Sequence, residues 1–222
     1  HINYPIDDTK EFITIATTRP ETMLGDTAIA VNPNDDRYKS LIGKSVTIPL
    51  VGRKIKIISD EYADPEQGTG AVKITPAHDF NDYDVGKRNN LEIINILTSD
   101  GKINENAPKE FVGLDRFEAR KLIIKSLIKN ELLLKEENFI NKVPYGDRSN
   151  SIIEPFLTEQ WFVDAKKLSI KAKEIVNNKK TKFFPENWSK TYFQWMNNIE
   201  SWCISRQLWW GHQIPAWYGP DK

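Results

Sequence analysis

The spacing of apolar residues predicts a strand-rich first part of the chain. Short apolar or alternating runs, typical of strands, lie at 12–17, 27–31, 45–50, 53–59, 71–75 and 91–98. Two of these runs flank Val51-Gly52 and predict a β-hairpin with Ile55 and Ile57 on one face. The sequence Ser99-Asp100-Gly101 predicts a turn after the last run.

A helical spacing is clearest from 116 to about 135. Asp115 is a good N-cap, and Glu118 completes a pattern like a capping box. The predicted buried stripe of this helix consists of Phe117, Ile124, Leu127 and Ile128. Further helical patterns occupy 79–90, 164–177 and 188–199.

Strands interrupted by single helices predict a mixed α/β fold, with a curled, barrel-like sheet and surrounding helices. All seven tryptophans lie between Trp161 and Trp217, which predicts two parts. We expect a domain over 1–145, then an exit linker with a short strand at Ile152-Ile153 and a Trp-rich segment over 146–222. The run 202–212 is too aromatic to be left in solvent.

Composition narrows the class of protein. Hydrophobic residues make up 39% and charged residues 28%, as in soluble globular proteins. No apolar run approaches the roughly 18 residues that cross a bilayer, and the N-terminus has no secretory pattern. We therefore expect a cytoplasmic protein with no membrane partner. The single cysteine, Cys203, excludes an internal disulfide and a thiolate zinc site.

The net charge is zero, from 31 basic and 31 acidic residues. A protein that grips a long nucleic-acid backbone is usually basic. Any nucleic acid that binds here is therefore expected to make a small, local contact.

Candidate chemistry concentrates in 68–86, where a Gly-Thr-Gly turn leads into an apolar strand and Pro76 is followed by an acidic cluster. Asp79 and Asp82, three positions apart at a helix start, can point the same way, and the helix N-terminus favours their ionised forms. Together they can hold an ammonium group and accept a hydrogen bond from a hydroxyl. The alternative is that one caps the helix and the other is solvated.

Lys73 and Thr75 share one face of the preceding strand, because side chains alternate along a strand. One interpretation has Lys73 half-exposed in water. The other has Lys73 and Thr75 lining the pocket that Asp79 and Asp82 close.

Thr17, Thr18 and Arg19 follow another strand. Arg19 either makes a two-pronged contact to a phosphate or ligand oxygen, or pairs with Glu21 at the surface. His78 is either a general base or a tautomer-locked hydrogen-bond partner. No serine or cysteine stands in a recognisable nucleophile setting, and no phosphate-binding loop is present.

Two of these segments carry a family resemblance. Thr-Thr-Arg-Pro-Glu-Thr-Met-Leu-Gly-Asp-Thr-Ala at 17–28 and Lys-Ile-Thr-Pro-Ala-His-Asp at 73–79 resemble the editing insert (connective peptide 1) of class I aminoacyl-tRNA synthetases, in its valyl form. Leucyl and isoleucyl inserts differ at Glu21, Lys73 and Asp79. The segment 202–217 resembles the return of the chain to the Rossmann catalytic core.

The resemblance implies a hydrolase that removes threonine mischarged onto tRNA of the valine type. It implies that Asp82 holds the aminoacyl ammonium and that Asp79, with Lys73 and Thr75, receives the threonine hydroxyl. Arg19 is expected at the 3′-terminal nucleotides. The other implied tRNA-binding residues are Thr17, Thr18, His78 and Gln67, the last standing where many valyl relatives have Phe.

The resemblance also implies partners. The parent enzyme ligates valine to tRNA with ATP and magnesium, but the two catalytic signatures of that reaction are absent from this chain. We therefore expect no metal or cofactor here, attack by water, and two partners, the tRNA CCA end and the remainder of the synthetase. The alternatives are a trans-acting deacylase, a non-catalytic module for the tRNA 3′ end, and a leucyl- or isoleucyl-type insert.

Overall fold

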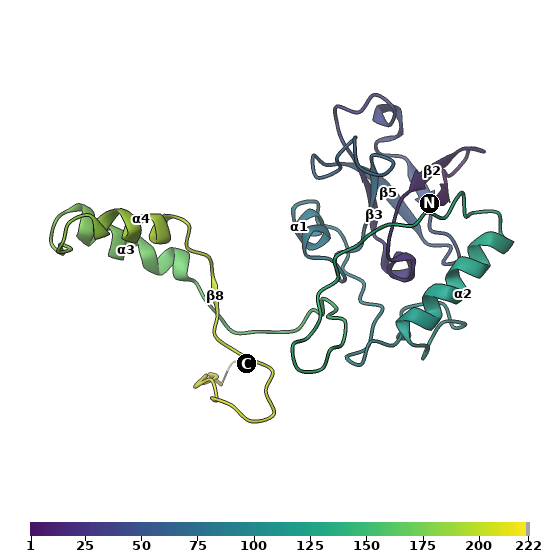
Figure 1. Ribbon diagram of the computed structural model, residues 1–222. Coiled ribbons are helices and arrows are strands. Elements are labelled where there is room, and N and C mark those ends of the chain that lie inside the picture. The colour runs from purple at the N-terminus through teal and green to yellow at the C-terminus, as the bar shows by residue number, and fades with distance from the viewer. Residues whose placement is uncertain (221–222) are drawn as a thin grey trace. The chain divides into compact units, whose positions relative to one another are not determined.

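The computed structural model describes residues 1–220 and divides into two compact units, His1–Leu157 and a second unit from Thr158 onward. The elements confirm the predicted mixed α/β class (Figure 1). Every helix in the described residues is too short or too polar to cross a bilayer.

Two sheets form the first unit. Strands β1 (Ile2–Pro5) and β2 (Phe12–Ile15) pair antiparallel. A four-stranded sheet has the order β4-β5-β3-β6, in which β3 runs parallel to β5 and antiparallel to β6. Its strands are β4 (Ser45–Thr47), β5 (Lys54–Ser59), β3 (Ala28–Val31) and β6 (Ala71–Ile74). The β4–β5 pairing confirms the predicted hairpin, and Ile55 and Ile57 are both buried.

The predicted barrel is not closed. An isolated bridge between Ile6 and Val46 links the two sheets on one side, while β2 lies near β6 on the other without a ladder between them in residues 1–220. The strand predicted at 91–98 was also wrong. This segment makes only an isolated bridge, between Leu97 and Ile103. Several of its backbone groups bond to side chains: the Ile96 amide donates to His78, and the Asn95 and Leu97 carbonyls accept from Asn104.

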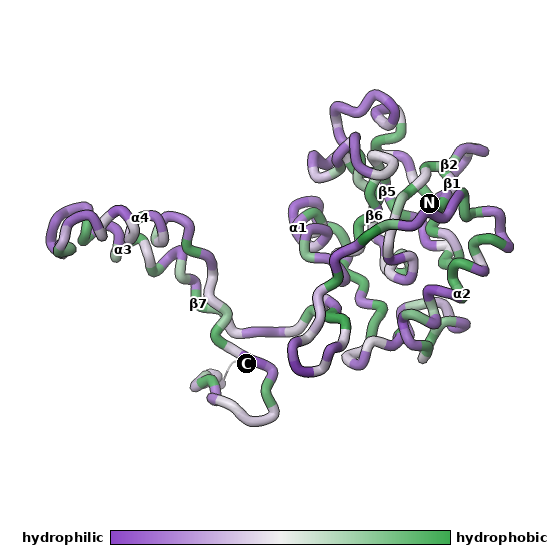
Figure 2. Tube along the Cα trace, viewed as in Figure 1, coloured by the Kyte–Doolittle hydropathy of each residue, from purple (hydrophilic) through white to green (hydrophobic). Residues whose placement is uncertain are grey.

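Strand β3 is buried on both faces and separates two apolar clusters. Ile29 and Val31 enter the larger core, whereas Ala28 and Ala30 enter a smaller one with Ile74 and Val85. Figure 2 shows hydrophobic residues along the neighbouring strands β5 and β6. Because Val85 belongs to helix α1 (Phe80–Arg88), this smaller cluster holds α1 against the sheet. That packing places the start of α1 beside the end of β6.

Helix α2 (Arg116–Lys129) begins at the predicted N-cap, where Asp115 accepts a hydrogen bond from the Phe117 amide. Glu118 pairs with Lys121 and does not complete a capping box. The helix ends before 135, at the Asn130 cap. The predicted stripe was largely wrong: Ala119, Ile123 and Leu127 are the buried residues, because this row faces the core beside η1 (Pro20–Gly25). Of the predicted stripe, Leu127 is buried, Phe117 and Ile124 are half-buried, and Ile128 is exposed.

The second unit contains the predicted helices as α3 (Ala165–Asn177) and α4 (Trp188–Asn197). Strands β7 (Phe162–Val163) and β8 (Trp202–Cys203) pair antiparallel. Trp209 and Trp210 of the run 202–212, and Trp217 after it, are almost fully exposed. That another part of a larger protein covers this run stays a prediction. No strand is recorded at Ile152-Ile153, where Ile152 makes only an isolated bridge with Tyr145.

The boundary between the compact units follows Leu157, further along the chain than the predicted start of the linker at 146. The physical reason is Glu154, whose carboxylate pairs with Arg19 and Arg116 of the first unit. These ion pairs hold the segment before Leu157 against that unit.

Candidate functional site

The candidate site lies where β6 ends and α1 begins. Asp79 is the N-cap of α1, and its Oδ1 accepts hydrogen bonds from the amides of Asn81 at 2.8 Å and Asp82 at 3.2 Å. Asp82 turns inward and is 5% exposed. Its Oδ2 accepts a hydrogen bond from the Thr75 amide at 2.9 Å. One carboxylate therefore caps the helix, while the other is buried and not solvated.

Lys73 and Thr75 point the same way, as the strand alternation predicts. Lys73 Nζ donates to Thr75 Oγ1 at 2.5 Å, and both residues are buried. The interpretation of Lys73 as a half-exposed lysine is therefore wrong, because the side chain has buried partners in place of water. The structure thus brings Lys73, Thr75 and Asp82 together.

Asp26 completes this cluster and was not singled out from the sequence. It is fully buried, and its Oδ1 lies 2.5 Å from Thr75 Oγ1 and 3.4 Å from Lys73 Nζ. Its Oδ2 accepts a hydrogen bond from Tyr4 Oη at 2.7 Å. The sequence signal that could have found it is an aspartate directly before an apolar strand. An aspartate at such a position is readily buried, and a buried aspartate requires polar partners.

Burial dominates the electrostatics of the two inward carboxylates. Desolvation raises the pKa of Asp82 to about 6, against the opposing effects of Lys73 and the Thr75 amide. Desolvation also raises the pKa of Asp26, with Lys73, Thr75 and Tyr4 opposing the rise. An ammonium group placed beside Asp82 would favour its ionised form.

His78 is buried in the turn between β6 and α1. Its Nε2 accepts a hydrogen bond from the Ile96 amide at 2.9 Å, so in the neutral ring the proton is on Nδ1. Burial, followed by Arg19 and Lys73, lowers the pKa of His78 to about 3. These contacts favour the tautomer-locked interpretation over the general base.

Arg19 belongs to a row of alternating charges formed by Glu154, Arg19, Glu21 and Arg120. It donates to the His78 carbonyl at 2.9 Å, pairs with Glu154, and has its Nε 3.7 Å from Glu21. Glu21 is fully buried and accepts two hydrogen bonds of 2.7 Å from Arg120. The expected pairing of Arg19 with Glu21 is present, but Glu21 is an interior anchor and not a surface residue.

The remaining predicted residues are Thr17, Thr18 and Gln67. Thr17 Oγ1 accepts a hydrogen bond from the Arg19 amide at 3.0 Å, whereas Thr18 is exposed. Gln67 is exposed in the loop before Gly68. A Cβ at Gly68 would lie 3.1 Å from that of Ala16, so this loop packs closely against the end of β2. Within residues 1–220, no hydrogen bond ties the side chain of Thr18 or Gln67 to the Lys73 cluster.

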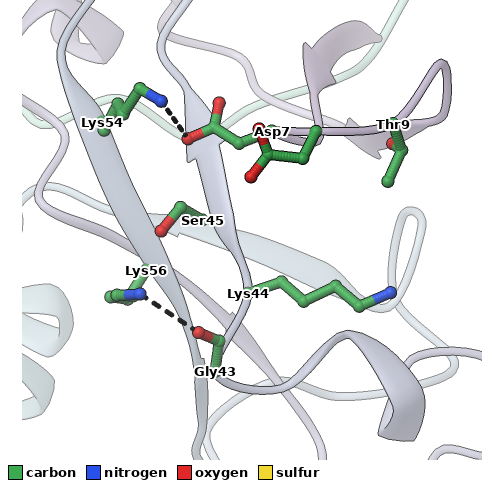
Figure 3. A pocket seen from close by; sticks show the side chains of 8 residues that line it. Asp7, Thr9, Gly43, Lys44, Ser45, Lys54 and Lys56 are labelled. Atoms are coloured by element: carbon green, nitrogen blue, oxygen red, sulfur yellow. Dashed lines mark hydrogen bonds and ion pairs between the residues drawn. The ribbon is translucent and has the colours of Figure 1, made fainter.

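A separate cleft of about 470 Å³ lies at the β4–β5 hairpin (Figure 3). It contains none of the candidate residues. Lys54 pairs with Asp7 at 3.1 Å and Lys56 donates to the Gly43 carbonyl at 3.3 Å, so two of its cations are engaged. We place the site at the cluster of Lys73, Thr75, Asp82 and Asp26, because the two buried carboxylates with raised pKa values lie there. In residues 1–220 no group of three or more His, Cys, Asp and Glu side chains is arranged to hold a metal ion.

Comparison with known protein families identifies the family of this chain. The sequence profile described as "tRNA synthetases class I (I, L, M and V)" matches residues 13–222. The chain belongs to the class I tRNA synthetases. This confirms the resemblance drawn from the Thr-Thr-Arg-Pro-Glu-Thr and Lys-Ile-Thr-Pro-Ala-His-Asp segments.

Within the class I synthetases, the similarity is to the valyl type. The chain is 82% identical over 222 residues to the valine–tRNA ligase of Pelagibacter ubique (strain HTCC1062), covering 100% of this chain and 25% of that protein. It is 59% identical over 214 residues to the valine–tRNA ligase of Caulobacter vibrioides (strain ATCC 19089 / CIP 103742 / CB 15), covering 96% and 24%. The chain thus spans about a quarter of the length of these relatives.

Two solved structures also resemble this synthetase chain. The structure described as GlLeuRS-CP1 has a TM-score of 0.48 at 18% identity, covering 62% of this chain and 87% of that one. The ternary complex of Agrobacterium radiobacter K84 agnB2 LeuRS with tRNA and LeuAMS has a TM-score of 0.46 at 23% identity, covering 58% and 18%.

Proposed function

We propose that this chain is the editing unit of a valine–tRNA ligase and hydrolyses the ester of threonine mischarged onto tRNA of the valine type. The observation that supports this most is the buried contact of Lys73 with Thr75 beside the inward-turned Asp82. A hydroxyl on the substrate side chain finds both a donor and an acceptor there, whereas a methyl group finds neither.

The chemical need for such a site follows from the similarity of the two amino acids. Valine and threonine differ by a methyl group in place of a hydroxyl, so an apolar pocket that accepts valine cannot strongly reject threonine. A second site with buried polar groups discriminates better, because valine leaves those groups unpaired. The proposed editing unit supplies that second site.

The carboxylates at the start of α1 have separate tasks in this proposal. Asp82 holds the aminoacyl ammonium, since its Oδ2 is bound to the Thr75 amide and its Oδ1 remains for the substrate. Asp79 receives the threonine hydroxyl with Lys73 and Thr75, because the helix cap uses only its Oδ1. Water attacks the carbonyl, and positioning of the ester beside the substrate ribose hydroxyls lowers the barrier.

Arg19 contacts the 3′-terminal nucleotides in this proposal, with Thr17, Thr18, Gln67 and His78 around it. Its guanidinium is already paired with Glu154. A phosphate of the CCA end would therefore replace the Glu154 carboxylate, which offers similar oxygen acceptors. Single-stranded nucleotides at one end of the tRNA are compatible with a chain of zero net charge.

The rest of the reaction cycle is proposed to lie outside this chain. The ligase binds ATP and magnesium to activate valine, while the editing unit works without a cofactor in the cytoplasm. The exposed Trp209, Trp210 and Trp217 are proposed to meet the remainder of the synthetase. A trans-acting deacylase would leave these side chains in water, which favours the unit within a ligase.

The test uses tRNA of the valine type charged with threonine. We expect this chain to hydrolyse the threonyl ester, both alone and when it replaces the matched quarter of the Pelagibacter ubique ligase. Asp82→Ala removes the hydrolysis, because the ammonium anchor is lost, while Asp84→Ala on the exposed face of α1 retains it. Wild-type rates in Asp82→Ala, or no hydrolysis by the chimaera, would contradict the proposal.

A further inference from the structure

The zero net charge of this chain is the sum of an acidic first unit and a basic second unit. Residues 1–157 contain 21 basic and 25 acidic residues, whereas residues 158–222 contain ten basic and six acidic residues. The positive charge is concentrated in 166–190, which contains eight lysines and two glutamates. Such an excess of lysine attracts polyanions, although the whole chain is neutral.

Most of these eight lysines have no negative partner inside the protein. Within residues 1–220, Lys166 alone among them forms an ion pair, with Glu200 at 2.7 Å. Six of the others are exposed and are called the lysine surface below: Lys167, Lys171, Lys179, Lys180, Lys182 and Lys190. Unpaired like charges repel one another, so this surface is suited to an anion from outside the chain.

The densest part of the lysine surface is the turn between α3 and α4, at the end of this helix pair away from β8 (Figure 1). Helix α3 ends here in a Schellman motif. The Lys179 amide donates to the Val176 carbonyl at 3.0 Å, and the Lys180 amide donates to the Ile175 carbonyl at 2.9 Å. These two bonds fix the backbone that carries Lys179 and Lys180.

Lys179 occupies the position of this motif at which glycine is the favoured residue. Its φ is 56°, in the left-handed region that is unfavourable for a residue with a Cβ. A cation near a helix C-terminus is favourable, but Lys180 and Lys182 already supply that charge. Lys179 therefore adds backbone strain and like-charge repulsion without a compensating contact in the described part of the chain.

We propose that the lysine surface, centred on the turn with Lys179, Lys180 and Lys182, binds the phosphate backbone of the tRNA outside its CCA end. The fully exposed Phe184 supplies an aromatic face for an unpaired base beside these cations. This inference rests on the proposed editing function, which makes tRNA the substrate. The lysines act as point charges on phosphates, so they position the tRNA and do not distinguish one ester from another.

The binding test measures the fluorescence anisotropy of labelled, uncharged tRNA of the valine type with this chain at several salt concentrations. The triple variant Lys179→Gln/Lys180→Gln/Lys182→Gln should bind about tenfold more weakly at low salt. Its slope of log affinity against log salt should be smaller by about 2 to 3. An unchanged slope overturns the inference. The matched control removes three exposed lysines of the first unit, in Lys109→Gln/Lys125→Gln/Lys129→Gln, and should change the affinity less than about twofold.

Lys179→Gly separates tRNA binding from structural support. Glycine relieves the left-handed backbone, so the urea midpoint of the second unit should rise, while the salt slope of tRNA binding falls by about 1. Tryptophan fluorescence follows this unfolding selectively, because all seven tryptophans lie in the second unit. A purely structural role does not produce a more stable chain that binds more weakly. Unchanged tRNA affinity in Lys179→Gly overturns the inference.

Glu131→Gly is the matched control for the backbone change. Glu131 follows α2 with a φ of 57°, and the amides of Glu131 and Leu132 donate to the carbonyls of Ile128 and Leu127 in the same motif. This variant should stabilise the first unit without weakening tRNA binding. Weakening equal to that of Lys179→Gly would assign the effect to the backbone and would overturn the inference.

Two other partners of the lysine surface would give different results. If it meets an acidic surface of the remainder of the synthetase, the triple variant in the Pelagibacter ubique ligase keeps its tRNA affinity and has a lower urea midpoint. If it meets a membrane, the wild type binds phosphatidylserine vesicles and tRNA does not compete. Either result overturns the inference. Failure of the proposed function is distinguishable, because the wild type would then bind uncharged tRNA through these lysines yet hydrolyse neither ester.

Discussion

Replacing Asp82 with Asn should stabilise the protein at neutral pH while it abolishes hydrolysis. Burial raises the pKa of Asp82 to about 6, whereas an unfolded aspartate titrates near its usual value of 3.8. Between these values the folded state binds more protons than the unfolded state, so this carboxyl makes stability fall as pH rises. The asparagine variant keeps an oxygen that accepts the hydrogen bond from the Thr75 amide. Because asparagine does not ionise, the variant does not lose stability in this way as the pH rises.

The magnitude follows from the pKa gap. About 1.5 units of the gap lie above pH 4.5, and one unit corresponds to about 1.4 kcal/mol. The difference in the free energy of unfolding, variant minus wild type, should therefore rise by about 2 kcal/mol from pH 4.5 to pH 7.5. Urea denaturation at both pH values measures it, with Asp84→Asn on the exposed face of α1 as the matched control.

The same ionisation predicts the pH profile of hydrolysis. Asp82 must be ionised to hold the ammonium, so kcat/KM for the threonyl ester should fall as pH drops through about 6, after subtraction of uncatalysed hydrolysis. A difference in unfolding free energy that does not change with pH, together with a flat profile from pH 5 to 7.5, would refute the assigned burial of Asp82.

Three further outcomes are expected. Asp79→Ala should lower the threonyl-to-valyl hydrolysis ratio and cost about 1 kcal/mol as a lost cap, and an unchanged ratio would count against its proposed role. Glu154→Gln should tighten binding of a CCA-ending oligonucleotide up to about fivefold by freeing Arg19; titration showing weaker binding would contradict the exchange. Leu127→Ala should cost about 2–5 kcal/mol and Ile128→Ala under about 0.5, so equal urea midpoints would disprove the register of α2.

Local signals predicted the elements that depend on neighbouring residues. The β4–β5 hairpin follows from Val51-Gly52 between two alternating runs, and both α1 and α2 begin at an aspartate that caps its own helix. These features depend only on a few residues that are close in sequence, so they can be predicted from the sequence alone.

Features that depend on distant partners were missed. The apolar run 122–128 offers several helical stripes, and contact with the core selected the row through Ile123 and Leu127. Likewise, Asp26 is buried because Tyr4, Lys73 and Thr75 arrive from elsewhere in the chain. Strand alternation predicted that Lys73 and Thr75 share a face, but neither their hydrogen bond nor the buried Asp26 beside them was predicted.

The proposed editing function is tested most directly by the ratio of kcat/KM for hydrolysis of threonyl and valyl esters on the same valine-type tRNA, with the chain in the Pelagibacter ubique ligase background. We expect a strong preference for the threonyl ester that falls in Thr75→Val and persists in Thr75→Ser. Equal hydrolysis of both esters by the wild type, or a preference that survives Thr75→Val, would contradict it.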